Sequence, residues 1–186
     1  MQALIHQTAS ILKNKGIILY PTDTIWGLGC LTNFSDSIEK IYTIKNRPVH
    51  KSFIILVSSI PMLKRYIVNI DKELLKQISS FDKPTTIIYP EVQNLPKDVL
   101  ATNGSAAIRI VKHPFCTPLI DEIDQPLVST SANISNLPGP QNFTEIAHEI
   151  KLKVDFIVEN IPEKFSIQKP SEIFEIQANN HLKKIR

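Results

Sequence analysis

Apolar residues along the chain follow helical spacing in some stretches and form short continuous runs in others. Near the start, apolar positions between residues 4 and 12 fall on one face of a predicted helix, and Gly16 supplies its end. The apolar run at residues 16–20 then predicts a buried strand. We expect this strand to deliver the next sequence, PTDTIWGLGC at residues 21–30, to a loop at its carboxyl end.

The rest of the chain continues this alternation, and strands become more frequent toward the end. Asp36 and Glu39 are typical of a helix start, and Pro48 ends that helix, so KNRP forms its last turn. Further helices are predicted around Leu74 to Ile78, at 113–123 and at 142–150. Further strands are predicted at 52–57, 84–90, 106–111, 125–133, 154–158, 171–176 and 181–186.

Alternating helices and strands with a strand-rich end are typical of an α/β domain that borders on α+β, with a mixed sheet flanked by helices. The length of 186 residues fits one domain, which we take to span residues 1–186. A chain of this size buries roughly 70% of the surface that its unfolded form exposes, so it needs no disulfide or structural metal for stability.

Composition narrows the class of protein. Hydrophobic residues make up 42% of the chain, and 21 basic against 18 acidic residues leave a net charge of +3. This excess is too small to indicate a nucleic-acid-binding protein by itself. Cys30 and Cys116 lack the spacing of a zinc site, and no apolar run is long enough to span a membrane. We expect a soluble cytoplasmic protein.

Familiar catalytic motifs are absent from the sequence. GLGC at residues 27–30 has two glycines of a dinucleotide-binding fingerprint and lacks the third. No G-x-x-x-x-G-K-[ST] phosphate loop, H-E-x-x-H zinc motif or G-x-S-x-G nucleophile motif occurs. Any chemistry must therefore come from a less regular set of residues.

Three polar clusters stand where predicted strands or helices end: PTDTIWGLG at 21–29, KNRPVHKS at 45–52 and STSANIS at 129–135. Ligands gather at the carboxyl ends of strands in open α/β sheets, so we expect the clusters to line one crevice. Each also has a purely structural interpretation. In that interpretation, the first cluster forms a turn after Pro21, the second places cations against a helix dipole, and the third supplies serine or asparagine caps.

Arg109 stands between two isoleucines in the predicted strand AAIRIV. If that strand is central, the guanidinium must find a partner, either an internal carboxylate or a bound anion. Nothing in the sequence pairs His113 and Cys116 as base and nucleophile, so we interpret both as structural.

Taken together, PTDTIWGLG, K-x-R with the following Pro48 and Lys51, AAIRIVKHP, and STSAN-x-S resemble the YrdC-like threonylcarbamoyl-AMP synthase family in its short, single-domain form. The resemblance extends from about Gly16 to Ile176. It implies a twisted YrdC-like fold with a large, positively lined concave cavity. It also implies an enzyme that forms threonylcarbamoyl-AMP and pyrophosphate from L-threonine, bicarbonate and ATP, for the t6A modification beside the tRNA anticodon.

The resemblance implies roles for matching positions, and catalysis by electrostatic stabilisation from Lys45 and Arg47 without a protein nucleophile. It implies Mg²⁺ bound with ATP and no metal ligand from the protein. The residues that it associates with ATP are Lys45, Arg47, Lys51, Ser105, Ser131 and Asn133. Those expected to bind L-threonine are Thr22, Thr24, Arg109 and Ser171, with Thr22 and Thr24 as candidates for reading its hydroxyl.

Other expectations concern the glycines of the chain. Gly27 and Gly29 are expected to let the backbone approach the substrate, with Trp26 as a wall of the pocket. The chain has Asn136 where family members often carry glycine, and asparagine can adopt the same left-handed conformation. Glu159 and Asn160 replace a glycine pair near the C-terminal lid of the family.

Two alternatives remain at this stage. One is an RNA-binding or regulatory relative without turnover, with weak affinity for transfer or double-stranded RNA and a basic tail of Lys183, Lys184 and Arg186. The other is a relative that acts on a different carbamoyl or acyl adenylate. For the synthase, the resemblance implies that the product passes to the threonylcarbamoyl transferase machinery that modifies tRNA.

Overall fold

The computed structural model describes residues 1–48, 52–159, 161, 169–178 and 180–186. These residues form a nine-stranded mixed sheet, ordered β7-β1-β2-β6-β3-β5-β4-β8-β9. Three neighbouring pairs, β1/β7, β3/β5 and β4/β8, are parallel, and the others are antiparallel. The strands are β1 (Ile18–Tyr20), β2 (Gly27–Leu31), β3 (Ile54–Val57), β4 (Thr85–Tyr89), β5 (Ala106–Ile110), β6 (Leu127–Ser131), β7 (Phe156–Ile157), β8 (Glu172–Ile176) and β9 (Leu182–Lys184).

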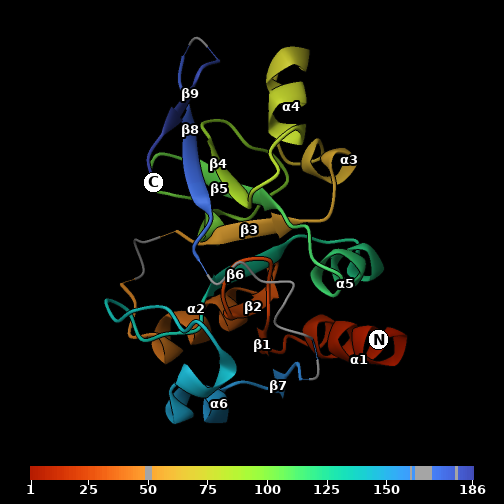
Figure 1. Cartoon of the computed structure of the whole chain (residues 1–186), viewed down its shortest axis with the longest axis vertical. Helices are drawn as coiled ribbons and strands as arrows, with labels where there is room; N and C mark the ends of the chain where they lie inside the picture. Colours follow the sequence, from red (N-terminus) through yellow and green to blue (C-terminus); the bar gives the residue numbers. More distant parts are fainter. Residues whose placement is uncertain (49–51, 160, 162–168, 179) are drawn as a thin grey trace.

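Helices flank this sheet, which confirms the predicted fold class. Figure 1 shows α1, α5, α3 and α4 along one side of the strands, with α2 and α6 near the β1 and β2 end. The helices are α1 (Gln2–Lys13), α2 (Ser35–Ile44), α3 (Ile60–Leu63), α4 (Lys72–Ser79), α5 (Cys116–Ile123) and α6 (His148–Lys153). No helix in the described part of the chain combines the length and apolar character needed to cross a membrane.

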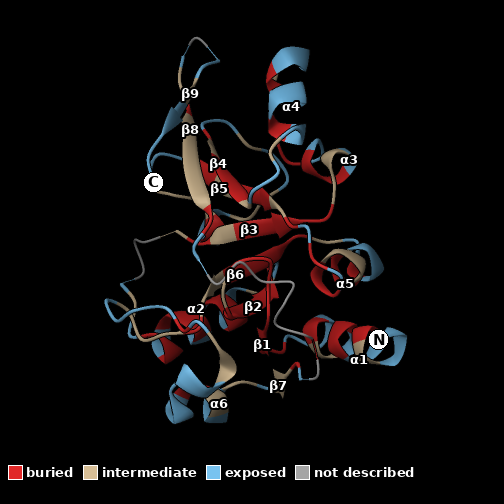
Figure 2. Cartoon of the chain, in the orientation of Figure 1, coloured by how far each residue is buried: buried red, intermediate tan, exposed pale blue. Residues whose placement is uncertain are grey.

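The two faces of the sheet differ in side-chain size. Strand register places Cys30, Val128, Ile55, Ile108 and Ile87 in one row across five strands, and none is more than 1% exposed. This row belongs to the buried core that Figure 2 shows along the central strands. Burying such apolar area is the main force that stabilises the fold.

The other face carries short side chains in the middle of the sheet. Gly27 pairs with Ser131 between β2 and β6, and Ser129, Ile54 and Ala107 occupy paired positions in β6, β3 and β5. Because a paired row shares one face, the small residues leave a hollow that larger side chains would fill. This hollow positions the candidate site.

Three element predictions were wrong. KNRP, expected as the last turn of a helix, lies beyond α2, which ends at Ile44, and Asn46 has a left-handed φ of 47°. Residues 27–30, expected to belong to a loop, lie in β2, which pairs with β1 and β6. Glycine has low intrinsic strand propensity, and here packing overrides it. The helix predicted at 142–150 is instead a 3₁₀ turn, Phe143–Glu145, followed by α6. The Asn142 side chain accepts from the backbone N–H groups of Thr144 and Glu145, which stabilises a separate short turn.

Candidate functional site

A cavity of about 440 Å³ lies on the small-residue face of the sheet. All three polar clusters contribute to its wall, which confirms that they converge. The described lining residues include three arginines and no acidic residue. Its polar lining is made by Thr22, Thr24, Trp26, Arg47, Ser52, Arg109, Ser129, Thr130, Ser131, Asn133, Ser171 and Arg186.

The glycines in β2 have different roles. Gly27 lines the cavity, and a Cβ there would lie 3.3 Å from the Ser129 Oγ. Gly29 does not line the cavity. A Cβ on Gly29 would lie 2.8 Å from both the Tyr20 ring and the Val128 carbonyl oxygen, so Gly29 leaves room for packing inside the sheet. The expectation that Gly29 lets the backbone approach a substrate was therefore wrong.

Lys45 ties the second cluster to the third. Its ammonium donates to the carbonyl oxygens of Ser131 and Asn133, the latter at 2.6 Å, and to the Asn133 Oδ1 at 3.3 Å. The Ser135 N–H in turn donates to the Lys45 carbonyl at 2.8 Å. Lys45 is only 1% exposed and does not line the cavity among the described residues. Its ammonium therefore stabilises the 131–137 loop through hydrogen bonds to Ser131 and Asn133.

Burial gives Lys45 an unusual titration. Desolvation, and secondarily the charge of Arg47, lower its pKa from 10.5 to about 7. Between these values the unfolded lysine binds a proton that the folded one does not, so this residue makes stability rise with pH.

A pH series on the wild type and the Lys45→Met variant tests this linkage. Between pH 7 and 8 the free energy of unfolding of the wild type should gain about 1 kcal/mol from Lys45, and the variant should lack this gain. Urea unfolding at each pH measures the difference. The pH series stops at pH 8 because the two cysteines add a pH dependence of their own above it. Their thiols ionise near pH 8.5 in the unfolded chain, whereas burial raises the pKa of Cys30 and Cys116 in the folded protein. Equal slopes in the two proteins would contradict the assignment.

Arg47 and Asn133 are held in the wall of the cavity. The Arg47 Nη2 donates to the Ser52 carbonyl at 2.7 Å, and its guanidinium carbon lies 5.1 Å from the centroid of the Phe53 ring. The Asn133 side-chain amide donates to the carbonyl oxygens of Ile134 at 3.1 Å and Leu137 at 2.5 Å. Asn136 in the same loop has a φ of 70°, the left-handed conformation expected for it.

Thr22 and Thr24 form an ordered pair of hydroxyls. The Thr22 hydroxyl donates to the Ile25 carbonyl at 2.8 Å, and a carbonyl can only accept. The 2.9 Å bond between the two threonine oxygens must therefore have Thr24 as donor. The Thr24 oxygen thus meets other groups as an acceptor, and it accepts from the Arg109 Nη2 at 3.4 Å. The Thr22 hydroxyl orients Thr24.

Arg109 has the internal carboxylate partner that was one of its two predicted options. Its Nη2 lies 3.1 Å from the Asp23 Oδ1, and both side chains are 4% exposed. Sequence reasoning gave Asp23 no role in the site. Its position between Thr22 and Thr24 was the available signal.

Ser171 and Arg186 also line the cavity. The Ser171 and Thr86 hydroxyls are 2.8 Å apart, and the Ser171 carbonyl accepts from Arg186 Nε at 3.3 Å and Nη2 at 3.2 Å. Burial, and then the charge of Arg109, lower the pKa of Arg186. Arg186, Lys183 and Lys184, expected in a basic tail, are all exposed, but only Arg186 among them lines the cavity.

The remaining predicted residues lie elsewhere. Ser105 is buried before β5, bonds to the Asn103 Oδ1 at 2.7 Å and does not line the cavity. Lys51 lies outside the described residues. The His113 Nδ1 accepts from the backbone N–H groups of Phe115 and Cys116, and burial lowers its pKa to about 4. The Cys116 thiol donates to the Pro21 carbonyl at 3.3 Å. These contacts support the structural interpretation of both residues.

Comparison with known proteins shows similarity in sequence over most of the chain. The Sua5/YciO/YrdC family model, described as "Telomere recombination", matches residues 10–186. A threonylcarbamoyl-AMP synthase from Psychromonas ingrahamii is 36% identical over 142 residues, 73% of each chain. One from Hydrogenovibrio crunogenus is 27% identical over 183 residues, 96% of each chain.

Solved structures share the fold. E. coli YciO matches with a TM-score of 0.84 and 23% identity, over 100% of this chain and 89% of that chain. P. abyssi Sua5 complexed with L-threonine matches with a TM-score of 0.82 and 23% identity, over 92% of this chain and 50% of that chain. The chain therefore spans about half the length of the Sua5 structures that it matches.

Proposed function

The chain belongs to the Sua5/YciO/YrdC family, and we propose that it is a threonylcarbamoyl-AMP synthase. The reaction joins L-threonine, bicarbonate and ATP into threonylcarbamoyl-AMP and releases pyrophosphate and water. The single observation that carries this proposal is the cavity: three arginines and several hydroxyls line it, and no described acidic residue does. Such a lining suits a polyanion and an amino acid bound side by side. Relatives named threonylcarbamoyl-AMP synthase support the same reaction.

The main obstacle to this reaction is charge. A carbamate oxygen must approach the α-phosphorus of ATP, and two like charges 4 Å apart repel by roughly 4 kcal/mol at an effective dielectric of about 20. Arg47 on one wall, together with the loop whose shape the Asn133 amide fixes, would bind the phosphates and stabilise the charge that develops on the leaving pyrophosphate. Lys45 would contribute indirectly, by holding in position the loop that carries Ser131 and Asn133.

The threonine subsite would lie at Arg109, Thr24 and Ser171. Arg109 would bind the carboxylate, and the Thr24 oxygen would accept a hydrogen bond from a donor on the substrate. Thr22 would keep Thr24 in this orientation. Holding carbamate and phosphorus together replaces an encounter of separate reactants by a step within one complex.

Magnesium would enter with ATP. The described residues contain no group of three or more His, Cys, Asp or Glu side chains able to hold a metal ion. The lining fits a metal that the triphosphate itself holds, and Mg²⁺ would there neutralise phosphate charge. We also propose that the labile product passes to a tRNA-modifying transferase.

Substrate selectivity tests the proposal. Pyrophosphate release with Mg²⁺ and ATP should require both threonine and bicarbonate. Serine lacks one methyl group, so its kcat/KM should be about 10- to 100-fold lower, and valine should react far less because it leaves a buried polar partner unpaired. Equal rates for threonine and valine would show that the site does not read the hydroxyl. Release without bicarbonate would indicate ordinary amino-acid activation.

A further inference from the structure

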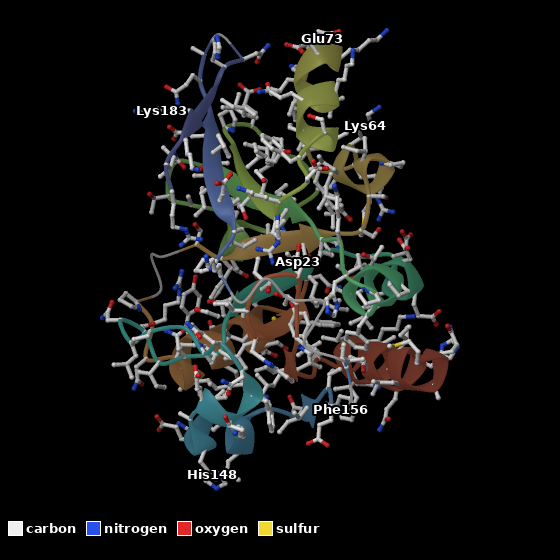
Figure 3. The ribbon with its side chains drawn as sticks, in the orientation of Figure 1. Asp23, Lys64, Glu73, His148, Phe156 and Lys183 are labelled. Atoms are coloured by element: carbon white, nitrogen blue, oxygen red, sulfur yellow. The ribbon has the colours of Figure 1, made fainter. Side chains whose placement is uncertain are left out.

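Asp23 is a buried acid that the proposed chemistry does not use. Figure 3 shows it in the middle of the molecule, whereas the labelled Glu73 and Lys183 lie at the periphery. Four other ion pairs among the described residues each include at least one side chain that is 42% or more exposed. The Asp23 and Arg109 side chains are each 4% exposed.

Stability does not explain this pair. Desolvating two charges costs several kcal/mol per ion, and apolar residues of similar volume often stabilise a protein as well or better. The pair is also poorly hydrogen-bonded. Four buried side-chain atoms have no hydrogen-bond partner in the described part of the protein, and three of them are the two Asp23 oxygens and the Arg109 Nε. Attraction between charges therefore holds the two groups together, with hydrogen-bonding capacity left over.

The ion pair between Asp23 and Arg109 affects the charge of the cavity wall. Arg109 lines the cavity together with Arg47 and Arg186, and Asp23 lies within ion-pair distance of Arg109. A carboxylate at 3.1 Å offsets most of the charge that Arg109 presents. A guanidinium offset in this way can still bind a singly charged carboxylate through its remaining donors, but it attracts a dianionic phosphate much less.

We propose that Asp23 is a positioning and specificity-determining residue that reserves Arg109 for the amino-acid carboxylate and keeps phosphate groups out of the threonine subsite. It anchors the Nη2 of Arg109, which Thr24 also contacts, and its charge makes this arginine unattractive to polyphosphate. The inference rests on the proposed function, since it takes L-threonine as the ligand at Arg109.

The test is calorimetric binding of L-threonine, without ATP, in the absence and presence of excess inorganic phosphate. In the wild type, phosphate should leave threonine affinity unchanged. In Asp23→Asn, threonine should bind about tenfold more weakly, because residue 23 no longer carries the charge that holds Arg109 in position. Phosphate should now compete with threonine, since Arg109 is no longer offset. The matched control is Asp36→Asn, which removes an exposed acid paired with Lys15 and should behave as the wild type.

Asp23→Glu separates charge from position and serves if Asp23→Asn does not fold. It should weaken threonine binding yet still exclude phosphate. Competition by phosphate in the Glu variant, or its absence in a folded Asn variant that binds threonine, would overturn the inference. A purely structural role would weaken threonine without any new competition. Failure of the wild type to bind threonine would instead count against the proposed function.

Discussion

Replacing Arg109 with methionine is expected to lower kcat/KM for threonine by about 100-fold or more and to destabilise the protein. The first effect follows because a desolvated charge contact to the substrate carboxylate is lost, which costs about 2–5 kcal/mol. The second follows because Asp23 is left buried without its partner, a change that costs about 3–5 kcal/mol of stability. Steady-state kinetics and urea unfolding measure the two effects.

A second variant separates these effects. Adding Asp23→Asn to Arg109→Met removes the uncompensated carboxylate, so stability should recover while activity stays low. The control is Arg65→Met, which breaks an exposed pair with Asp124 and should change stability by no more than about 1 kcal/mol. Full activity of Arg109→Met would show that the guanidinium does not bind substrate.

Asn133→Asp is expected to raise the KM for ATP by about 100-fold and to leave the KM for threonine nearly unchanged. The substitution places a negative charge in a wall that carries no described acid, close to where the phosphates are proposed to bind. At about 4 kcal/mol for a pair of like charges 4 Å apart, repulsion is large enough for this effect even after partial screening. Kinetics with each substrate varied in turn gives both constants.

Asn133→Ala provides the comparison. It removes the two amide hydrogen bonds to Ile134 and Leu137 without adding charge, so its effect on the KM for ATP should be smaller. If Asp and Ala raised this KM equally, loop geometry rather than charge would explain the change. If the aspartate variant raised both KM values alike, the proposed division of the cavity would be wrong.

The fold could be predicted where periodicity was strong. The buried face of α1, with Ile5, Ala9 and Leu12, follows its helical spacing, and the central strands follow their apolar runs. Strand β2 could not be predicted, because its glycines are required by contacts with residues of other strands. Gly29 is needed where the Tyr20 ring and the Val128 carbonyl approach within 2.8 Å of the missing Cβ, and local sequence does not contain that contact.

The site was predictable as a set of clusters and less so as a set of contacts. The position of the polar clusters at the ends of predicted strands and helices placed Arg47, Asn133 and Thr24 in one crevice, and the structure confirms it. It did not reveal that Lys45 faces a loop backbone, because a lysine at the end of a helix has no preferred partner in sequence. Arg186 was missed because its place depends on the chain after β9, where Ile173 accepts its backbone N–H and donates to its carbonyl oxygen.

The mass of the reaction product distinguishes threonylcarbamoyl-AMP synthesis from every alternative considered above. Purified protein is incubated with ATP, Mg²⁺, L-threonine and ¹³C-bicarbonate, and the nucleotide products are analysed by mass spectrometry. We expect an AMP adduct that contains threonine and one ¹³C atom and that disappears when Asn133→Asp replaces the wild type at low ATP. An adenylate of threonine without the labelled carbon, or no adduct at all from folded protein, would contradict the proposed function.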